Sequence, residues 1–184
     1  MSTVALIDYG SGNVHSAARA LNRAGERIGG VDVRLTHDPD AVRAADRIVL
    51  PGVGHFADCM AALSSQEGLV GALEEAVLHR ATPFLGICVG MQLMADFSLE
   101  DGDHAGLGWL HGRVVAVDSG PGLVVPHMGW NELHVHQPHP VLAELGETPH
   151  AYFVHSYAYA PEEAHHIAAT TDYRSEERRV GKEC

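Results

Sequence analysis

The stretch PFLGICVGMQLM, residues 83–94, constrains the fold of this chain more than any other part of the sequence. An apolar run ends at Cys88, one glycine stands two places before it and another two places after it, and a second apolar run follows. This order is typical of a buried strand that turns sharply into a helix, where glycines leave room for a strained backbone and for the neighbouring helix. Cys88 is therefore a candidate nucleophile at the carboxyl edge of a sheet.

The start of a helix also suits the chemistry of a thiol. Unpaired N–H groups and a partial positive charge at a helix N-terminus favour the thiolate over the thiol. The N–H of Val89 is expected to point to the place where an oxyanion forms. A second interpretation stays open at this point: Cys88 could be a buried cysteine at a strand end, with glycines that serve only packing.

The first half of the chain alternates between strand and helix patterns. Gly25 is predicted to end the first helix, and Gly68 to break the long helical stretch that comes later. The alternation predicts an α/β fold with a mostly parallel sheet and helices on both faces. The predicted strands are residues 4–7, 31–35, 47–50 and 84–87, and the predicted helices are residues 14–25, residues 56–78 and a helix that opens near residue 89.

The second half has a different pattern, with short strand-like runs punctuated by Gly, Pro and His. We expect these runs to continue the sheet with antiparallel additions. With 184 residues, of which 46% are hydrophobic, the chain fits one globular domain with a real core. The runs are residues 113–117, 123–125, 130–135, 151–159 and 166–171.

The composition limits the classes of binding partner and the cellular compartment that we expect for this chain. The formal net charge of −12 argues against a nucleic-acid groove. No apolar run reaches the roughly 20 residues of a membrane span, and the N-terminus does not have the pattern of a signal peptide. Three cysteines form no obvious disulfide set, so a reducing cytoplasm is expected. Cys59 lies in an apolar helical pattern and is predicted to be a buried small side chain.

A second glycine-rich loop, LPGVGHF at residues 50–56, follows the predicted strand before the cysteine motif. Parallel topology brings this loop to the same sheet edge as Cys88. Gly52 and Gly54 would let the backbone aim an N–H inward as the other half of an oxyanion hole, although a plain Pro-Gly turn would read the same way. Together the two loops predict acyl transfer to a thiolate.

Five motifs in order, DYGSGN, LPGVGHF, GICVGMQ, PHMGWNE and YFVHSY, resemble the glutaminase subunits of imidazole glycerol phosphate synthase. These are class I glutamine amidotransferases of histidine biosynthesis, with a flavodoxin-like α/β fold. The resemblance runs from about residue 4 to residue 173. The cysteine motif alone indicates the broader class, and PHMGWNE and DYGSGN narrow it to this member. Val89 stands where leucine is usual, which leaves the role of its backbone N–H intact.

The resemblance implies a mechanism without a cofactor or a metal. Cys88 attacks the side-chain amide of glutamine and forms a γ-glutamyl thioester, which water then hydrolyses to glutamate. The backbone of the PGVG loop and the N–H after the cysteine stabilise the oxyanion, while one side chain and a backbone segment hold the amino-acid end of the substrate. The implied oxyanion residues are Gly52, Val53 and Val89, and the implied substrate-binding residues are Gln92, His155, Ser156 and Tyr157.

The resemblance also implies a partner. Ammonia passes to a barrel-shaped cyclase subunit in a heterodimer, and Asn13, Trp130 and Tyr152 match positions near that interface. Each has a plainer interpretation: Asn13 is a good helix N-cap, Trp130 could be ordinary sheet packing, and Tyr152 alternates with Phe153, so one of the two faces the core.

The family takes its base and carboxylate from a His-Pro-Glu motif, which these 184 residues lack. The only His-Pro pair, at His139, is followed by Val141. Residues 174–184, RSEERRVGKEC, resemble a translated sequencing adapter. We therefore expect an amidotransferase domain at residues 1–173 that is incomplete at its C-terminus, a non-native tail, and glutamine turnover close to background.

The sequence disfavours a metal site and a dinucleotide-binding loop. His134 and His136 share a strand face, with His139 or His127 as a third ligand, but no carboxylate or cysteine converges on them, which disfavours a metal site. GSGNVH lacks the third glycine of a dinucleotide loop, since His15 occupies that position. The remaining alternatives are a stand-alone cysteine hydrolase of the same architecture and a non-catalytic subunit that docks on the synthase.

Overall fold

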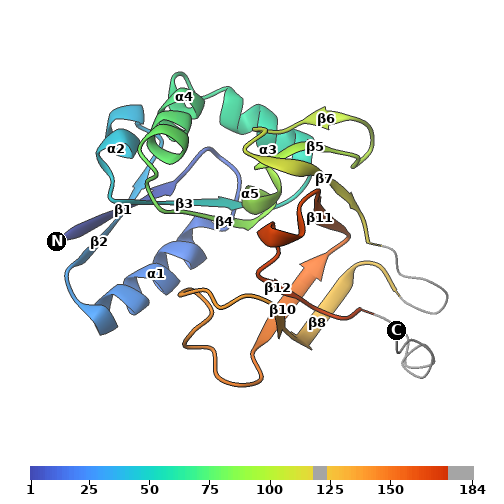
Figure 1. Ribbon diagram of the computed structural model, residues 1–184. Helices are drawn as coiled ribbons and strands as arrows, with labels where there is room; N and C mark the ends of the chain where they lie inside the picture. Colours follow the sequence, from blue (N-terminus) through green and yellow to red (C-terminus); the bar gives the residue numbers. More distant parts are fainter. Residues whose placement is uncertain (118–123, 174–184) are drawn as a thin grey trace. The chain divides into compact units, whose positions relative to one another are not determined.

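The computed structural model describes residues 1–117 and 124–173. Residues 1–110 form one compact unit, and a second unit begins at His111. Figure 1 shows the course of the chain and the labels of its helices and strands. The predicted tail at residues 174–184 and the predicted strand residue Leu123 lie outside the described residues.

A four-stranded parallel sheet forms the centre of the first unit, with the strand order β2-β1-β3-β4. All four of its strands were predicted, because each is a short apolar or alternating run that ends in a turn signal. Residue pairing between β3 and β4 places Gly52 opposite Cys88. The strands are β1 (Ser2–Ile7), β2 (Val31–Thr36), β3 (Arg47–Gly52) and β4 (Phe84–Cys88).

Helices cover both faces of this sheet, as predicted. Helix α1 (Val14–Ile28) packs on the face that carries Val4, Leu6 and Val49. In Figure 1, α2, α3 and α4 lie on the opposite side of the sheet from α1. Burial on both faces explains the continuous apolar sequences of β1 and β3, which are buried along most of their length. The bounds of these helices are α2 (Pro39–Ala44), α3 (Phe56–Ser64) and α4 (Leu69–Glu74).

The prediction that Gly25 ends the first helix is wrong. Helix α1 continues to Ile28 and ends at Gly29, whose φ is 73° and whose N–H donates to the Gly25 carbonyl. Gly25 is buried inside the helix, and a β-carbon there would lie 3.1 Å from the Val31 β-carbon. The glycine is therefore explained by the close approach of β2 and not by helix termination.

The predicted break at Gly68 is confirmed. Gly68 has a φ of 73° and precedes α4, while α3 ends at Ser64. Helix α4 continues directly into η1 (Glu75–His79), a single π-helical turn.

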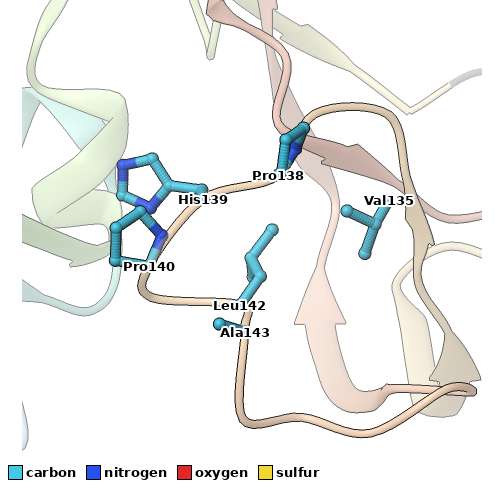
Figure 2. Close-up of a pocket in the computed structure, with 6 residues that line it drawn as sticks. All are labelled: Val135, Pro138, His139, Pro140, Leu142 and Ala143. Carbon is cyan, nitrogen blue, oxygen red and sulfur yellow. The ribbon is translucent and has the colours of Figure 1, made fainter.

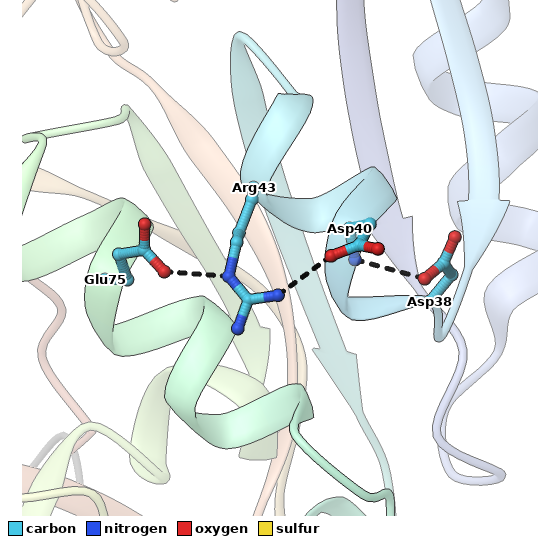
Figure 3. Close-up of polar contacts among 4 residues, drawn as sticks. All are labelled: Asp38, Asp40, Arg43 and Glu75. Carbon is cyan, nitrogen blue, oxygen red and sulfur yellow. Dashed lines mark hydrogen bonds and ion pairs between the residues drawn. The ribbon is translucent and has the colours of Figure 1, made fainter.

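Helix α2 was not predicted from the sequence. Its signals are local and short: Asp38 accepts a hydrogen bond from the Asp40 N–H at 3.0 Å, and Pro39 occupies the first turn. Arg43, near the end of α2, reaches Asp40 at 3.0 Å and Glu75 at 2.7 Å (Figure 3). These ion pairs connect α2 to the start of η1, and the hydrogen bond to Glu75 raises the pKa of Arg43.

After β4 the chain forms α5 (Val89–Gln92) and then a small antiparallel hairpin. The hairpin consists of β5 (Ala95–Ser98) and β6 (His104–Ala105). Helix α5 opens where the sequence predicts it, but it is only four residues long.

The second unit is built from antiparallel strand pairs, as predicted for this half of the chain. The pairs are β7 with β11, β8 with β10, and β9 with β12. The prediction that these runs continue the parallel sheet is wrong, because the strands belong to separate antiparallel sheets. Val124 and Val125, predicted as part of a strand, are not in one. The bounds are β7 (Leu110–Ala116), β8 (His127–Glu132), β9 (His134–Val135), β10 (His150–His155), β11 (Tyr157–Pro161), η2 (Ala164–His166) and β12 (Ala169–Thr170).

The second unit also contains an open apolar hollow of about 500 Å³ beside the turn that follows β9 (Figure 2). His139 is the one titratable side chain among the residues that line it. In the described part of the chain, no helix has the length and apolar character to cross a membrane. The lining residues are Val135, Pro138, His139, Pro140, Leu142 and Ala143.

Candidate active site

Cys88 occupies a strained bend at the end of β4. Its φ is 55° and its ψ is −121°, a backbone conformation that residues other than glycine rarely adopt. The thiol is free and the residue is exposed. The predicted sharp turn from strand to helix is thus confirmed, and the interpretation of Cys88 as a buried packing residue is wrong. Strain at an exposed nucleophilic side chain is typical of active sites.

The glycines around Cys88 are required by close backbone packing. A β-carbon at Gly86 would lie 2.7 Å from the Met91 nitrogen, and one at Gly90 would overlap the Leu50 carbonyl oxygen. These contacts press α5 against β3 and β4, so the bend at Cys88 has no space in which to relax.

The PGVG loop, residues 51–54, packs against the same backbone around Cys88. A β-carbon at Gly52 would lie 2.6 Å from the Gly90 nitrogen and 2.9 Å from the Tyr9 hydroxyl oxygen. Val53 follows with about half of its surface exposed, and Gly54 has a φ of 94°. The structure therefore brings the two predicted glycine loops together at one end of the parallel sheet. The role of the backbone at Gly52, Val53 and Val89 in stabilising an oxyanion remains a prediction.

Val89 and Gln92 lie in the single turn of α5 and are both buried, with exposed fractions of 5% and 7%. The turn is too short to add a large helix dipole, so any stabilisation of a thiolate must come from the first backbone N–H groups themselves. The predicted role of Gln92 in holding substrate remains a prediction.

Three residues near the loop were missed as functional candidates: Tyr9, Ser11 and Cys59. The Tyr9 hydroxyl donates to the Pro51 carbonyl at 2.8 Å, and Ser11 Oγ donates to the Val53 carbonyl at 3.0 Å. Cys59 is buried, as predicted, but its thiol also contacts the Val53 carbonyl at 3.3 Å. The available signal was position, because Tyr9 and Ser11 follow β1, which neighbours β3 in the parallel sheet.

Burial raises the pKa of Tyr9 well above its ordinary value. The neighbouring thiol group of Cys59 and, to a smaller extent, that of Cys88 raise it further. Tyr9 therefore stays a protonated hydrogen-bond donor at physiological pH, and its bond to the Pro51 carbonyl holds the strand residue that precedes Gly52, the partner of Cys88 in the sheet.

His55, the histidine nearest to the PGVG loop in sequence, is committed to structure. Its Nδ1 accepts the Ala57 N–H at 3.2 Å, which caps α3, and its Nε2 lies 3.3 Å from an Asp101 carboxylate oxygen. Glu100 adds a second cap by accepting the Phe56 N–H at 2.8 Å. With both ring nitrogens engaged, His55 is poorly placed to act as a base.

In the second unit, His155 ends β10, Tyr157 begins β11, and Ser156 forms the bend between the two strands. His155 Nδ1 lies 3.1 Å from the Tyr157 carbonyl oxygen, and the Ser156 carbonyl accepts the Val117 N–H at 2.8 Å. The three predicted substrate-binding residues are thus adjacent and have a defined backbone, while their contact with substrate is a prediction.

Comparison with known proteins identifies the family. The sequence matches the family described as glutamine amidotransferase class-I over residues 5–181. The chain belongs to this family. It is also 52% identical over 174 residues to the imidazole glycerol phosphate synthase subunit HisH of Rhodospirillum rubrum, and the match covers 92% of this chain and 81% of that protein. HisH of Zymomonas mobilis is 50% identical over 173 residues, covering 94% and 79%.

Solved structures support the same fold at lower identity. A crystal structure of a glutamine amidotransferase superimposes with a TM-score of 0.66 at 15% identity, covering 90% of this chain and 78% of that one. A glutamine amidotransferase from Thermotoga maritima gives a TM-score of 0.52 at 17% identity, covering 87% and 63%. The α/β fold predicted from strand and helix periodicity is therefore confirmed as that of a class-I glutamine amidotransferase.

Two of the three residues predicted at the partner interface of this amidotransferase form an exposed aromatic pair. Trp130 on β8 and Tyr152 on β10 are opposite each other in the ladder, with ring centroids 5.6 Å apart and exposed fractions of 72% and 55%. Phe153 points the other way and stacks on His127, as the alternation predicted. Asn13 caps α1 by accepting the Ser16 N–H at 3.2 Å, so the N-cap interpretation is confirmed and its interface role stays a prediction.

His127 is buried in the second unit of the amidotransferase. Its Nδ1 lies 3.0 Å from His155 Nε2, and its ring stacks on Phe153 and Tyr173. Desolvation, with a smaller effect of the charge on His155, lowers the pKa of His127 below 6.5. The remaining histidines considered as metal ligands have separate partners: His134 lies 3.4 Å from Asp172, His136 lies 2.7 Å from Thr170 Oγ1, and His139 Nδ1 accepts the Val141 N–H at 3.2 Å. Among the residues that the structure describes, no group of His, Cys, Asp or Glu is arranged to hold a metal ion.

Proposed function

We propose that this chain is the glutaminase subunit of an imidazole glycerol phosphate synthase and that Cys88 is its nucleophile. The observation that supports this most directly is the strained, exposed conformation of Cys88 beside the PGVG loop. Membership of the glutamine amidotransferase class-I family and about 50% identity to HisH proteins give the substrate and the pathway, which is histidine biosynthesis.

The reaction proceeds in two steps. The Cys88 thiolate adds to the side-chain carboxamide carbon of glutamine, and the resulting oxyanion accepts hydrogen bonds from the backbone N–H groups of Val53 and Val89. Collapse breaks the C–N bond, the nitrogen takes up a proton and leaves as ammonia, and a γ-glutamyl thioester remains. Water then adds to the thioester, the C–S bond breaks, and glutamate leaves.

Glutamine is held at its amino-acid end by Gln92 and by the backbone at His155, Ser156 and Tyr157. Ammonia passes to a barrel-shaped cyclase, with which the chain forms a heterodimer through a surface that includes Asn13, Trp130 and Tyr152. The cyclase uses ammonia in the lyase reaction that forms imidazole glycerol phosphate. Both subunits work in the cytoplasm.

We further propose that the 184 residues alone turn over glutamine at close to background rates. The family's His-Pro-Glu motif is not among them, and without a base the proton transfers of both steps lose their catalyst. Residues 1–173 would then act as an amidotransferase domain that lacks its base, while residues 174–184 contribute nothing to the reaction. A non-catalytic docking subunit is the second candidate, favoured by the exposed Trp130–Tyr152 pair.

Glutamate release and complex formation, measured separately, test these proposals. The chain is mixed with the cyclase of the Rhodospirillum rubrum enzyme, and a second version carries the His-Pro-Glu segment of its HisH relative after Tyr173. The expected result is complex formation by both chains, glutamate release by the extended chain only, and loss of that release in Cys88→Ala. Glutamate release that survives Cys88→Ala in the extended chain would overturn the assignment of the nucleophile. Complex formation without glutamate release by the extended chain would favour the docking subunit.

A further inference from the structure

The Val53 carbonyl is held by two side chains that the proposed reaction does not use. Ser11 Oγ donates to this oxygen at 3.0 Å and Cys59 Sγ donates to it at 3.3 Å, while Oγ and Sγ lie 3.1 Å apart. Ser11 lies in the loop after β1, and Cys59 lies on α3. Two separate elements of the first unit thus meet at one carbonyl of the PGVG loop.

The Val53 oxygen has two possible side-chain donors, and Ser11 Oγ and Cys59 Sγ are also close enough to hydrogen-bond to each other. The hydroxyl and the thiol each bring one hydrogen, and the Val53 oxygen can accept both of them because a carbonyl has two lone pairs. Cys59 is 1% exposed, so its thiol makes this contact without competition from bulk water. A thiol is a weak donor, and we therefore expect Ser11 to supply the larger share of the interaction.

The Pro51 carbonyl, on the other side of the peptide between Gly52 and Val53, also accepts a side-chain hydrogen bond. Tyr9, which is 2% exposed, donates to the Pro51 carbonyl at 2.8 Å. The peptides before Gly52 and after Val53 are therefore both tied to side-chain donors from neighbouring elements. Because Gly52 lies opposite Cys88, these hydrogen bonds limit the movement of the peptide between Gly52 and Val53 relative to the nucleophile.

We propose that Ser11 and Cys59 are positioning residues for the oxyanion peptide of this enzyme. They act on the reaction through Val53 and do not touch substrate themselves. The inference rests on the proposed function, in which the Val53 N–H stabilises the oxyanion formed at Cys88. Loss of the two donors releases the Val53 carbonyl, so that reactions passing through an oxyanion slow down and reactions without one do not.

Two reagents that modify Cys88 distinguish reactions that form an oxyanion from reactions that do not, and neither reagent requires turnover of glutamine. A chloromethyl ketone analogue of glutamine reacts through addition of the Cys88 thiolate to its ketone, which forms an oxyanion before chloride leaves and the thioether remains. Iodoacetamide reacts by direct displacement of iodide, and no oxyanion forms. Rates are measured by mass spectrometry on the peptide that carries Cys88, because Cys59 and Cys184 also bear thiols.

In Ser11→Ala, modification by the ketone is expected to slow about fivefold, the effect of one lost hydrogen bond. In the double variant Ser11→Ala, Cys59→Ala it slows about tenfold or more. Iodoacetamide rates stay within about twofold of the wild type. Ser11→Thr and Cys59→Ser each keep a donor and retain most of the ketone rate. Ser64→Ala, which changes an exposed serine on the same helix as Cys59, serves as the matched control.

Equal slowing with both reagents would show that the variants displace Cys88 as a whole. Unchanged ketone rates would show that the hydrogen bonds of Ser11 and Cys59 to the Val53 carbonyl have no effect on the reaction. Either result overturns the inference. Thermal unfolding identifies variants that fail to fold, and Ser11→Thr and Cys59→Ser then carry the comparison. A wild-type chain that reacts no faster with the glutamine ketone than with chloroacetone would instead contradict the proposed function, before any variant is compared.

Discussion

Gly52 and Cys88 lie opposite each other at the ends of β3 and β4. The pairing brings an exposed sulfur next to a backbone that has no side chain at the point of closest approach. A β-carbon at Gly52 would lie 2.6 Å from the Gly90 nitrogen, so the arrangement depends on glycine. The reactive group and its surroundings are in this way placed by main-chain contacts.

The strain at Cys88 predicts that function and stability oppose each other at this position. Cys88→Gly should have a free energy of unfolding about 1 kcal/mol higher than Cys88→Ala, because glycine adopts the φ of 55° without strain. Both variants should lose all reaction with the glutamine ketone. Urea unfolding of the two variants provides the comparison, and alanine as the more stable of the pair would contradict the prediction.

The packing of Gly90 predicts a large cost for the smallest side chain. Gly90→Ala places a methyl group against the Leu50 carbonyl and should lower the free energy of unfolding by about 1–3 kcal/mol or more. Gly71→Ala is the matched control, since a β-carbon there meets nothing within 4 Å and alanine favours the helix. We expect Gly71→Ala to be stabilising by about 0.5–1 kcal/mol, and equal effects of the two substitutions would contradict this account.

The buried His127 predicts a loss of stability in mild acid. Its pKa is lowered in the folded protein, so the unfolded chain binds more protons between the folded pKa and 6.5. Its contribution to stability is therefore complete above pH 6.5 and decreases as the pH falls through 6.5 toward the folded value. NMR titration should give His127 a pKa below 6.5, and His127→Gln should flatten the pH dependence of the melting temperature between about pH 5 and 7.

The aromatic pair Trp130–Tyr152 predicts a separation of binding from folding. Both side chains are more than half exposed, so Trp130→Ala should change the free energy of unfolding by less than about 0.5 kcal/mol. If the pair is an anchor of the cyclase interface, the same change should weaken complex formation by about 2 kcal/mol, measured by calorimetry. Val141→Ala, at another exposed apolar residue of the second unit, provides the control.

Asn13 has a structural role that must be separated from its predicted interface role. Asn13→Ala removes the cap of α1 and should cost about 1 kcal/mol of stability, whereas Asn13→Asp keeps an acceptor for the Ser16 N–H. A contact of the amide with the cyclase would be lost in both variants. Weaker complex formation with alanine alone would reduce Asn13 to a helix cap.

Local patterns made much of the first unit predictable. Each strand of the parallel sheet is a short apolar run with a turn behind it, and the framed cysteine specifies a bend by itself. What failed depends on contacts distant in sequence. Gly25 is buried inside α1 because β2 passes close to it, and helix α2 has only the Asp38-Pro39 start to announce it.

The same reason explains the incomplete prediction of the site. The Tyr9–Pro51 hydrogen bond spans 42 positions and the Ser11–Cys59 contact spans 48. Neither pair has a sequence spacing or composition that identifies it as a contact. The one available signal was that β1 and β3 are neighbours in the sheet, so the loops that follow them lie side by side. The antiparallel pairs of the second unit were indicated only as a class, because alternation identifies a strand without naming its neighbour.

The contact between Gly25 and Val31 has a practical consequence for anyone who redesigns this protein. A glycine in mid-helix looks like an obvious site for a stabilising alanine, and an automated consensus or helix-propensity scheme would select it. Here the added methyl group would lie 3.1 Å from the Val31 β-carbon, so α1 or β2 must shift by a few tenths of an ångström to accept it. Gly25 allows α1 to pack closely on β2, and libraries that aim at higher thermal stability should keep this glycine.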